Sequence, residues 1–232
     1  MFTHKDLFVK IFETQDGSHS ILSEKFGVSY HSKYGAIQET LHVFIGEALR
    51  LKALETKKIA ILETGFGTGL NALMTWLDAE QFDLQIDYVT LETFPLPARE
   101  ARLLNYPEQL KRPDIAPVLW QMHESEWEKP VWLSPFFRFE KKKTDFREID
   151  FSDRFDIVYF DAFAPSAQPE LWTPEVLGKM YKSLKINGVF VTYCAKGVVK
   201  RTLRDLGFKV ESPKGPPGKR EMTRAIKVPL PS

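Results

Sequence analysis

The chain has 232 residues, 43% hydrophobic and 27% charged, which is the composition of an ordinary globular protein and excludes wholesale disorder. A single cysteine, Cys194, excludes an intramolecular disulfide framework and a cysteine-rich zinc site, and the net charge of +1 argues against a uniformly basic nucleic-acid-binding protein. No apolar run is long enough to span a membrane, and residues 1–6 lack the apolar stretch of a signal peptide, so we expect a cytoplasmic protein.

The first 55 residues predict an N-terminal extension made of a hairpin and a helix. Two apolar stretches, 7–13 and 19–25, flank the dipeptide Asp16-Gly17, which is typical of a hairpin turn. Apolar residues then recur at helical spacing, which predicts an amphipathic helix over 35–54. We expect this extension, residues 1–55, to pack on a catalytic domain formed by residues 56–232.

From Lys58 onward, short apolar strands alternate with helices. Strands are predicted at 59–62, 88–91, 136–139 and 155–160, and helices over 70–79 and from near Pro95. The stretch 107–135, rich in proline and tryptophan, allows no assignment. Thr173-Pro174-Glu175 has the residues of a helix start, so we expect a helix from there to Leu184.

The C-terminal part continues the alternation with a strand at 189–193, a helix over 196–206, and strands at 208–211 and 222–228. This pattern predicts an α/β fold with a doubly wound, mostly parallel sheet. Because no helix separates the last two strands, we expect them to pair antiparallel at one edge. Such sheets bind ligands beyond the carboxyl ends of their strands, so polar residues at those ends are the candidates for a site.

The first strand of this sheet leads into a glycine-rich loop that begins at Glu63. Gly65, Gly67 and Gly69 stand at alternate positions, where they let the backbone turn tightly and approach a ligand closely. Leu70 replaces the third glycine of the dinucleotide-binding pattern, and the lysine of a phosphate-binding loop is missing. Glu63 adds an anion that could accommodate a cationic ligand. The alternative is a plain tight turn.

Acidic residues also follow the second and third strands. Glu92 could accept both hydroxyls of a ribose through its two oxygens. Asp145 could accept a hydrogen bond from an adenine amino group, or it could simply cap a helix. Together with the glycine loop, these residues fit a cofactor that carries adenosine without a pyrophosphate, and S-adenosylmethionine is the common one.

The fourth strand ends in the most unusual stretch of the chain, residues 161–173. Asp161 emerges there from a buried strand, beside aromatic and proline residues. It could orient a primary amine, accept its proton, or both, which leaves the nitrogen lone pair free to attack a methyl sulfonium. Methyl transfer by direct displacement depends mainly on alignment of the reacting atoms. The alternative is an aspartate that caps the loop.

These motifs resemble the methyltransferase domain of the bifunctional tRNA-modifying MnmC family. The similar stretches are 65–71, 161–165, 169–173 and 219–222, with a further signature at 35–45, and the resemblance covers about residues 25–227. It implies a class I, Rossmann-like methyltransferase that uses S-adenosylmethionine to methylate the amine of 5-aminomethyl-2-thiouridine at the tRNA wobble position, giving 5-methylaminomethyl-2-thiouridine. Because the chain ends soon after its last predicted strand, we expect the family's flavin-dependent oxidase activity to be absent.

The turn between the last two strands should emerge on the same side of the sheet as the site. Its basic residues Lys214, Lys219 and Arg220 could meet tRNA phosphates, and the alternative is a solvated basic turn. Residues 179–227 hold 13 Lys and Arg against three Asp and Glu, so the net charge near zero conceals a basic C-terminal part. The five histidines show no metal-binding spacing, and we expect no metal.

The complete predicted site has three parts. Asp161 binds the amine; Phe163, Pro165 and Trp172 wall the substrate pocket; and Glu63, Gly65, Gly67, Gly69, Asn71, Glu92 and Asp145 hold the cofactor. A small-molecule amine methyltransferase or an aminopropyltransferase would share the fold and the strand-end acid, but would have no evident need for the basic turn. A catalytically silent RNA-binding module is a further alternative, against which the intact glycine loop and the acids argue. The oligomeric state is not predicted.

Overall fold

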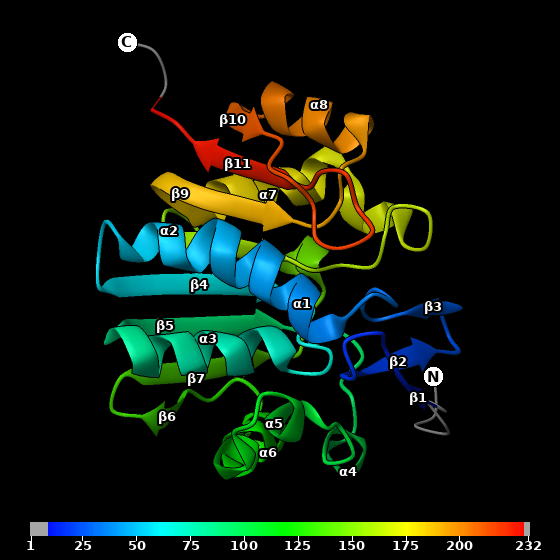
Figure 1. Cartoon of the computed structure of the whole chain (residues 1–232). Coiled ribbons are helices and arrows are strands. Elements are labelled where there is room, and N and C mark those ends of the chain that lie inside the picture. Colours follow the sequence, from blue (N-terminus) through cyan, green and yellow to red (C-terminus); the bar gives the residue numbers. More distant parts are fainter. Residues whose placement is uncertain (1–8, 230–232) are drawn as a thin grey trace.

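Five apolar strands form the parallel centre of a single large sheet (Figure 1). They are β4 (Lys58–Thr64), β5 (Gln85–Leu91), β7 (Phe137–Lys142), β8 (Phe155–Phe160) and β9 (Leu184–Thr192). With β6 (Val131–Ser134), β10 (Phe208–Glu211) and β11 (Thr223–Lys227), the strand order is β10-β11-β9-β8-β4-β5-β7-β6. The computed structural model describes residues 9–229 of the chain.

Helices cover both faces of this sheet, because neighbouring residues of its strands are apolar on both sides. On one face, Ile61 and Tyr159 pack with α3 (Leu70–Phe82) and with a helix that runs without a break through α1 (Ala36–Thr40), a π-helical segment (Leu41–Leu49) and α2 (Arg50–Ala53). On the other face, Leu62 and Phe160 pack with α7 (Pro174–Ser183) and α8 (Gly197–Asp205). The predicted doubly wound fold class is thereby confirmed.

The order of the last strands and the helix expected from Pro95 differ from the prediction. The final strand β11 pairs antiparallel with β10 as expected, but it also pairs antiparallel with β9, so it lies between them and β10 forms the edge. The opposite edge is β6, antiparallel to β7. The helix expected from Pro95 is only the short α4 (Ala98–Ala101). Pro95 and Pro97 keep the preceding backbone extended, which delays the helix.

The unassigned stretch 107–135 supplies short helices and the edge strand β6. The helices in this region are α5 (Tyr106–Gln109), a 3-10 turn (Pro113–Ile115) and α6 (Ala116–Glu124). Two further 3-10 turns, Phe146–Glu148 and Pro169–Trp172, follow β7 and β8. No helix within residues 9–229 is long and apolar enough to cross a membrane.

The N-terminal extension forms the predicted hairpin and a small sheet. β1 (Val9–Glu13) pairs antiparallel with β2 (His19–Ser23) around Gly17, and β2 pairs with β3 (Val28–Ser29). The beginning of the stretch predicted at 7–13 lies outside the described residues. In Figure 1 this small sheet lies at the end of the large sheet where the parallel strands have their carboxyl ends.

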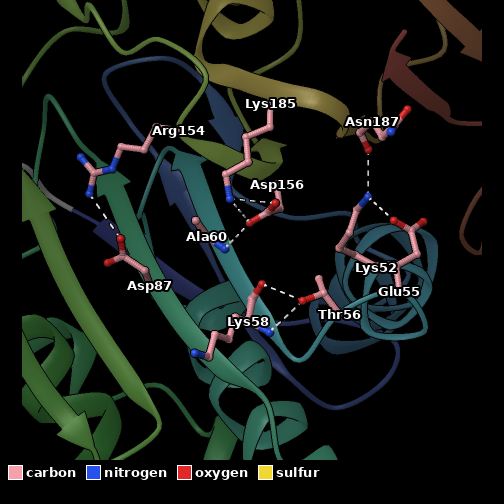
Figure 2. A network of polar contacts seen from close by, with 10 residues as sticks. All are labelled: Lys52, Glu55, Thr56, Lys58, Ala60, Asp87, Arg154, Asp156, Lys185 and Asn187. Atoms are coloured by element: carbon pink, nitrogen blue, oxygen red, sulfur yellow. Dashed lines mark hydrogen bonds and ion pairs between the residues drawn. The ribbon is translucent and has the colours of Figure 1, made fainter. Parts of the chain in front are cut away.

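Ion pairs and hydrogen bonds fix the opposite, amino-terminal end of the large sheet (Figure 2). The Asp156 carboxylate accepts a hydrogen bond from the backbone N–H of Ala60 at 2.8 Å and contacts Lys185 Nζ at 2.9 Å, which ties β8 to β4 and β9. Lys52 Nζ donates to the carbonyl oxygen of Asn187 at 2.8 Å, which ties α2 to β9. These polar groups therefore pair with one another across neighbouring elements.

Candidate active site

A cavity of about 280 Å³ opens at the carboxyl ends of β4, β5 and β8. Seven of the residues predicted from the sequence line its wall, and they come from four separate parts of the chain. They are Gly65, Gly67, Asn71, Glu92, Asp145, Asp161 and Phe163. The parallel sheet brings these residues together because its strands all end at this edge.

The glycine loop after β4 forms the floor of the cavity. Gly65 has φ +89°, and a Cβ atom there would lie 2.9 Å from the backbone oxygen of Asp161. Gly67 has φ +51°, and a Cβ atom there would lie 2.9 Å from the ring of Tyr30. Only glycine combines this backbone conformation with so close an approach. Gly69 also has a positive φ, but it begins α3 and does not line the cavity.

Glu92 is fixed by two backbone N–H groups. Gly67 donates to Oε2 at 3.0 Å and Phe94 donates to Oε1 at 2.8 Å, so the carboxylate bridges β5 and the glycine loop. Burial raises the pKa of Glu92 above its ordinary value, and these N–H donors oppose the rise. Each oxygen retains a lone pair, so the group could also accept the two hydroxyls of a ribose.

Asp145 caps a turn, as one of the two alternatives predicted, and it also lines the cavity. Its carboxylate accepts a hydrogen bond from the backbone N–H of Arg147 at 2.9 Å, which caps the 3-10 turn that follows. The guanidinium of Arg147 contacts both carboxylate oxygens and lowers the pKa of Asp145.

Asp161 is oriented by a chain of side-chain hydrogen bonds. Thr40 Oγ1 donates to Asn71 Oδ1 at 2.9 Å, and Asn71 Nδ2 donates to Asp161 Oδ2 at 2.9 Å. Burial raises the pKa of Asp161 to about 7, and the negative charge of Glu39 acts in the same direction. A carboxyl group with a pKa near neutrality can exchange a proton with a substrate at physiological pH.

Three of the predicted residues lie behind the cavity wall. Glu63 is fully buried beneath the loop, and Pro165 does not reach the cavity. Trp172 is buried against Phe160, with ring centroids 4.9 Å apart, and its indole N–H donates to the carbonyl oxygen of Phe163 at 2.8 Å. Trp172 therefore holds the backbone of the loop, because its ring is part of the core under α7.

The three predicted basic residues have different surroundings. Lys214 and Arg220 are exposed, as a phosphate-binding role requires. Lys219 turns inward instead. Its Nζ lies 2.7 Å from Glu39 Oε1 and 4.0 Å from the centroid of the Tyr193 ring.

The N-terminal extension contributes part of the cavity wall, which the sequence pattern did not predict. Lys25, Phe26, Tyr30 and His31 all line the cavity. The ring of Phe163 lies between Phe26, at 5.2 Å, and Tyr30, at 5.1 Å. The sequence offered only one signal for this wall, the aromatic residues Phe26 and Tyr30 in a short polar stretch. Such a stretch shows no hydrophobic periodicity from which a position in the fold could be predicted.

The side chains on the wall suit a positively charged, adenosine-bearing molecule. Four carboxylate residues line it, namely Glu92, Asp145, Asp161 and Glu170. Its two lysine and arginine groups are already engaged, because Lys25 Nζ lies over the Phe94 ring at 3.0 Å and Arg147 pairs with Asp145. In the glycine loop, Leu70 stands where the dinucleotide-binding pattern has its third glycine. Within residues 9–229 no group of three His, Cys, Asp or Glu side chains could hold a metal ion.

Comparisons with known proteins find methyltransferases and MnmC proteins among the relatives of this chain, and the longest matches cover nearly all of it. A family described as S-adenosyl-L-methionine-dependent methyltransferase matches residues 138–228. The tRNA 5-methylaminomethyl-2-thiouridine biosynthesis bifunctional protein MnmC of Chromohalobacter salexigens is 33% identical over 91% of this chain and 32% of its own length. The same protein of Nitrosospira multiformis is 30% identical over 87% of this chain and 34% of its own. The chain thus spans about a third of the length of the curated relatives it matches.

Two solved structures are similar in fold. The crystal structure of MNMC2 from Aquifex aeolicus has a TM-score of 0.79 and 29% identity, covering 98% of this chain and 73% of that one. Magnesium protoporphyrin IX methyltransferase from Synechocystis, solved with bound S-adenosylmethionine, has a TM-score of 0.52 and 10% identity, covering 82% of this chain and 80% of that one.

Proposed function

We propose that this chain, a homologue of about one third of the bifunctional MnmC proteins, methylates the amine of 5-aminomethyl-2-thiouridine at the wobble position of tRNA. The fold is that of an S-adenosylmethionine-dependent methyltransferase, and S-adenosylmethionine is its cofactor. The substrate and the roles of individual residues are parts of the proposal. A tRNA substrate would place the reaction in the cytoplasm.

The observation that carries the proposal is the position of Asp161 on the cavity wall, with its carboxyl group held by Asn71. An alkylamine is an ammonium ion at neutral pH and has no lone pair to offer until a proton leaves. Because Asn71 holds Oδ2, Oδ1 is the oxygen left to take this proton. A pKa of about 7 makes Asp161 a suitable acceptor.

The cofactor would lie along the glycine loop and across the ends of β4 and β5. When bound, S-adenosylmethionine supplies a methyl group attached to a positively charged sulfur. Gly65 and Gly67 would let the backbone approach it, Glu92 would bind its ribose, and Asp145 would lie at its adenine. Phe163, braced by Trp172, would confine the amine beside Asp161 and exclude water.

A basic surface on the C-terminal part of the chain supports RNA as the substrate. Within residues 179–227, five exposed basic residues form no ion pair with any residue in 9–229, and they lie on α8 with its N-cap and on the turn between β10 and β11. They are Lys196, Arg201, Arg204, Lys214 and Arg220. Such residues would contact phosphates and orient the RNA without reading its sequence. A small-molecule amine methyltransferase would not need this surface.

The decisive experiment is nucleoside analysis of tRNA that carries 5-aminomethyl-2-thiouridine after incubation with the protein and S-adenosylmethionine. We expect conversion to 5-methylaminomethyl-2-thiouridine. Asp161→Asn should slow conversion by about 10²- to 10⁴-fold, because it removes the proton acceptor. Binding of S-adenosylmethionine, measured by calorimetry, should change little.

The matched control is Asp150→Asn, which changes an exposed aspartate far from the cavity and should leave conversion unchanged. If 5-aminomethyl-2-thiouridine remained unmethylated after incubation with the wild-type protein, the proposed substrate would be refuted. Loss of cofactor binding together with activity in Asp161→Asn would refute the role given to Asp161.

A further inference from the structure

The turn between β10 and β11 is fastened to the N-terminal part of the chain beside Asp161. His42 Nε2 is 2.7 Å from the carbonyl oxygen of Lys214, and Gly218 packs so closely on the ring of Tyr34 that a Cβ atom would have no room. In Figure 1 this turn reaches the same end of the sheet as α1 and the small N-terminal sheet. The basic turn is therefore part of the architecture of the site.

A partly buried ion pair is another of these contacts. Lys219 Nζ lies 2.7 Å from Glu39 Oε1, and the other oxygen of Glu39 accepts a hydrogen bond from the backbone N–H of Ser32 at 2.9 Å. The Glu39 side chain is only 8% exposed. The Lys219 ammonium also lies over the ring of Tyr193, whose hydroxyl donates to the carbonyl oxygen of Ala162, the residue after Asp161.

We propose that Glu39 and Lys219 are positioning residues that set, through their opposite charges, how readily Asp161 takes the proton of the substrate amine. The inference rests on the proposed function, in which Asp161 accepts that proton. It gives Lys219 a role inside the site in place of the phosphate contact expected from the sequence.

The titratable groups that face Asp161 from β4, β5 and the end of β9 hold their protons at neutral pH, and Glu39 and Lys219 are the charges that act on its pKa. Tyr88 faces it from β5 and Tyr193 from the end of β9, and burial raises the pKa of both phenols well above their ordinary value. Glu63 faces it from β4, and burial raises the pKa of that carboxyl to about 8. Asn71 from α3 contributes a neutral hydrogen bond.

The two charges act in opposite directions. The negative charge of Glu39 raises the pKa of Asp161, and the positive charge of Lys219 lowers it. Removing Glu39 should therefore make Asp161 ionise at lower pH, and removing Lys219 should make it ionise at higher pH. A single nearby charge commonly shifts a pKa by about one unit or more.

The test is the pH dependence of single-turnover methyl transfer to tRNA carrying 5-aminomethyl-2-thiouridine, with S-adenosylmethionine and protein saturating. We expect the acidic limb of the profile to move about one pH unit down in Glu39→Gln and about one pH unit up in Lys219→Gln. The double variant should return close to the wild-type limb. Lys219→Arg keeps the charge and should keep the limb in place, and it also serves if Lys219→Gln fails to fold.

Lys209→Gln is the matched control, because it removes an exposed lysine of β10 that does not line the cavity. Its profile should equal that of the wild type. If both Glu39→Gln and Lys219→Gln lowered the rate at every pH without opposite displacements of the limb, the pair would be merely structural and the inference overturned. Failure of the wild-type protein to methylate would instead refute the proposed function.

Discussion

Glu63 makes a testable contribution to the pH dependence of stability. Neither of its carboxyl oxygens has a hydrogen-bond partner within residues 9–229, and the hydroxyls of Thr90 and Tyr88 face it outside hydrogen-bonding geometry. Burial raises the pKa of this carboxyl from 4.5 to about 8. Because the folded state holds the proton more tightly, the stability that Glu63 contributes is complete below about pH 4.5 and is lost as the pH rises through about 8.

The size of the loss follows from the pKa difference. At about 1.4 kcal/mol per pKa unit, the upper bound is about 5 kcal/mol, and relaxation of the site reduces it, so we expect a loss of about 2–3 kcal/mol. Glu63→Gln removes the titration without removing a hydrogen bond. The free energy of unfolding, measured with urea between pH 5 and pH 8, should therefore fall with pH more steeply in the wild type than in the variant.

The comparison rests on slopes, so a uniform change in stability caused by the buried amide does not affect it. Glu148→Gln, at an exposed position in the turn after β7, should have the wild-type slope. If the wild type and Glu63→Gln showed parallel pH dependences, Glu63 would be ionised in the folded protein, and the argument from burial would be wrong.

Two further variants test the loop and the orientation of Asp161. In Gly67→Ala, the new methyl group would meet the Tyr30 ring at a backbone φ of +51°. We expect the free energy of unfolding to fall by about 1–3 kcal/mol and S-adenosylmethionine to bind more weakly in calorimetry. Unchanged binding would show that the loop does not contact the cofactor. In Asn71→Ala, Asp161 loses its hydrogen-bond donor. The rate of single-turnover methyl transfer should therefore fall by about 10²-fold, while cofactor binding persists. A rate equal to that of the wild type would show that Asn71 does not orient Asp161.

The fold could be predicted from the sequence because its signals are local. The apolar run of β8 indicated a strand buried on both faces, and the glycines after β4 indicated a loop that approaches a ligand. The insertion of β11 between β9 and β10 has no such signal. Strand order depends on pairing between distant segments, and the sequence of a β-strand does not indicate which strand it pairs with.

The site was predictable only where one strand end determined the position of a side chain. Glu92 and Asp161 follow directly from the strands before them, and both lie on the cavity wall. Phe26 lines the same cavity although it lies more than a hundred residues before Asp161 in the sequence, and no hydrophobic periodicity in its segment indicates this position. Trp172 was predicted to line the pocket because of the aromatic character of its loop, but its ring lies in the core.

The distribution of charge required the structure as well, because ion pairs across the fold change what a count of basic residues means. Of the 13 Lys and Arg in 179–227, seven pair with acids within residues 9–229, five of them with acids that precede residue 179. These pairs neutralise more than half of the basic residues in this part of the chain. What stays unpaired and exposed lies on α8 with its N-cap and on the turn at Lys214 and Arg220. An RNA held by this surface would be presented to the end of the sheet where Asp161 lies.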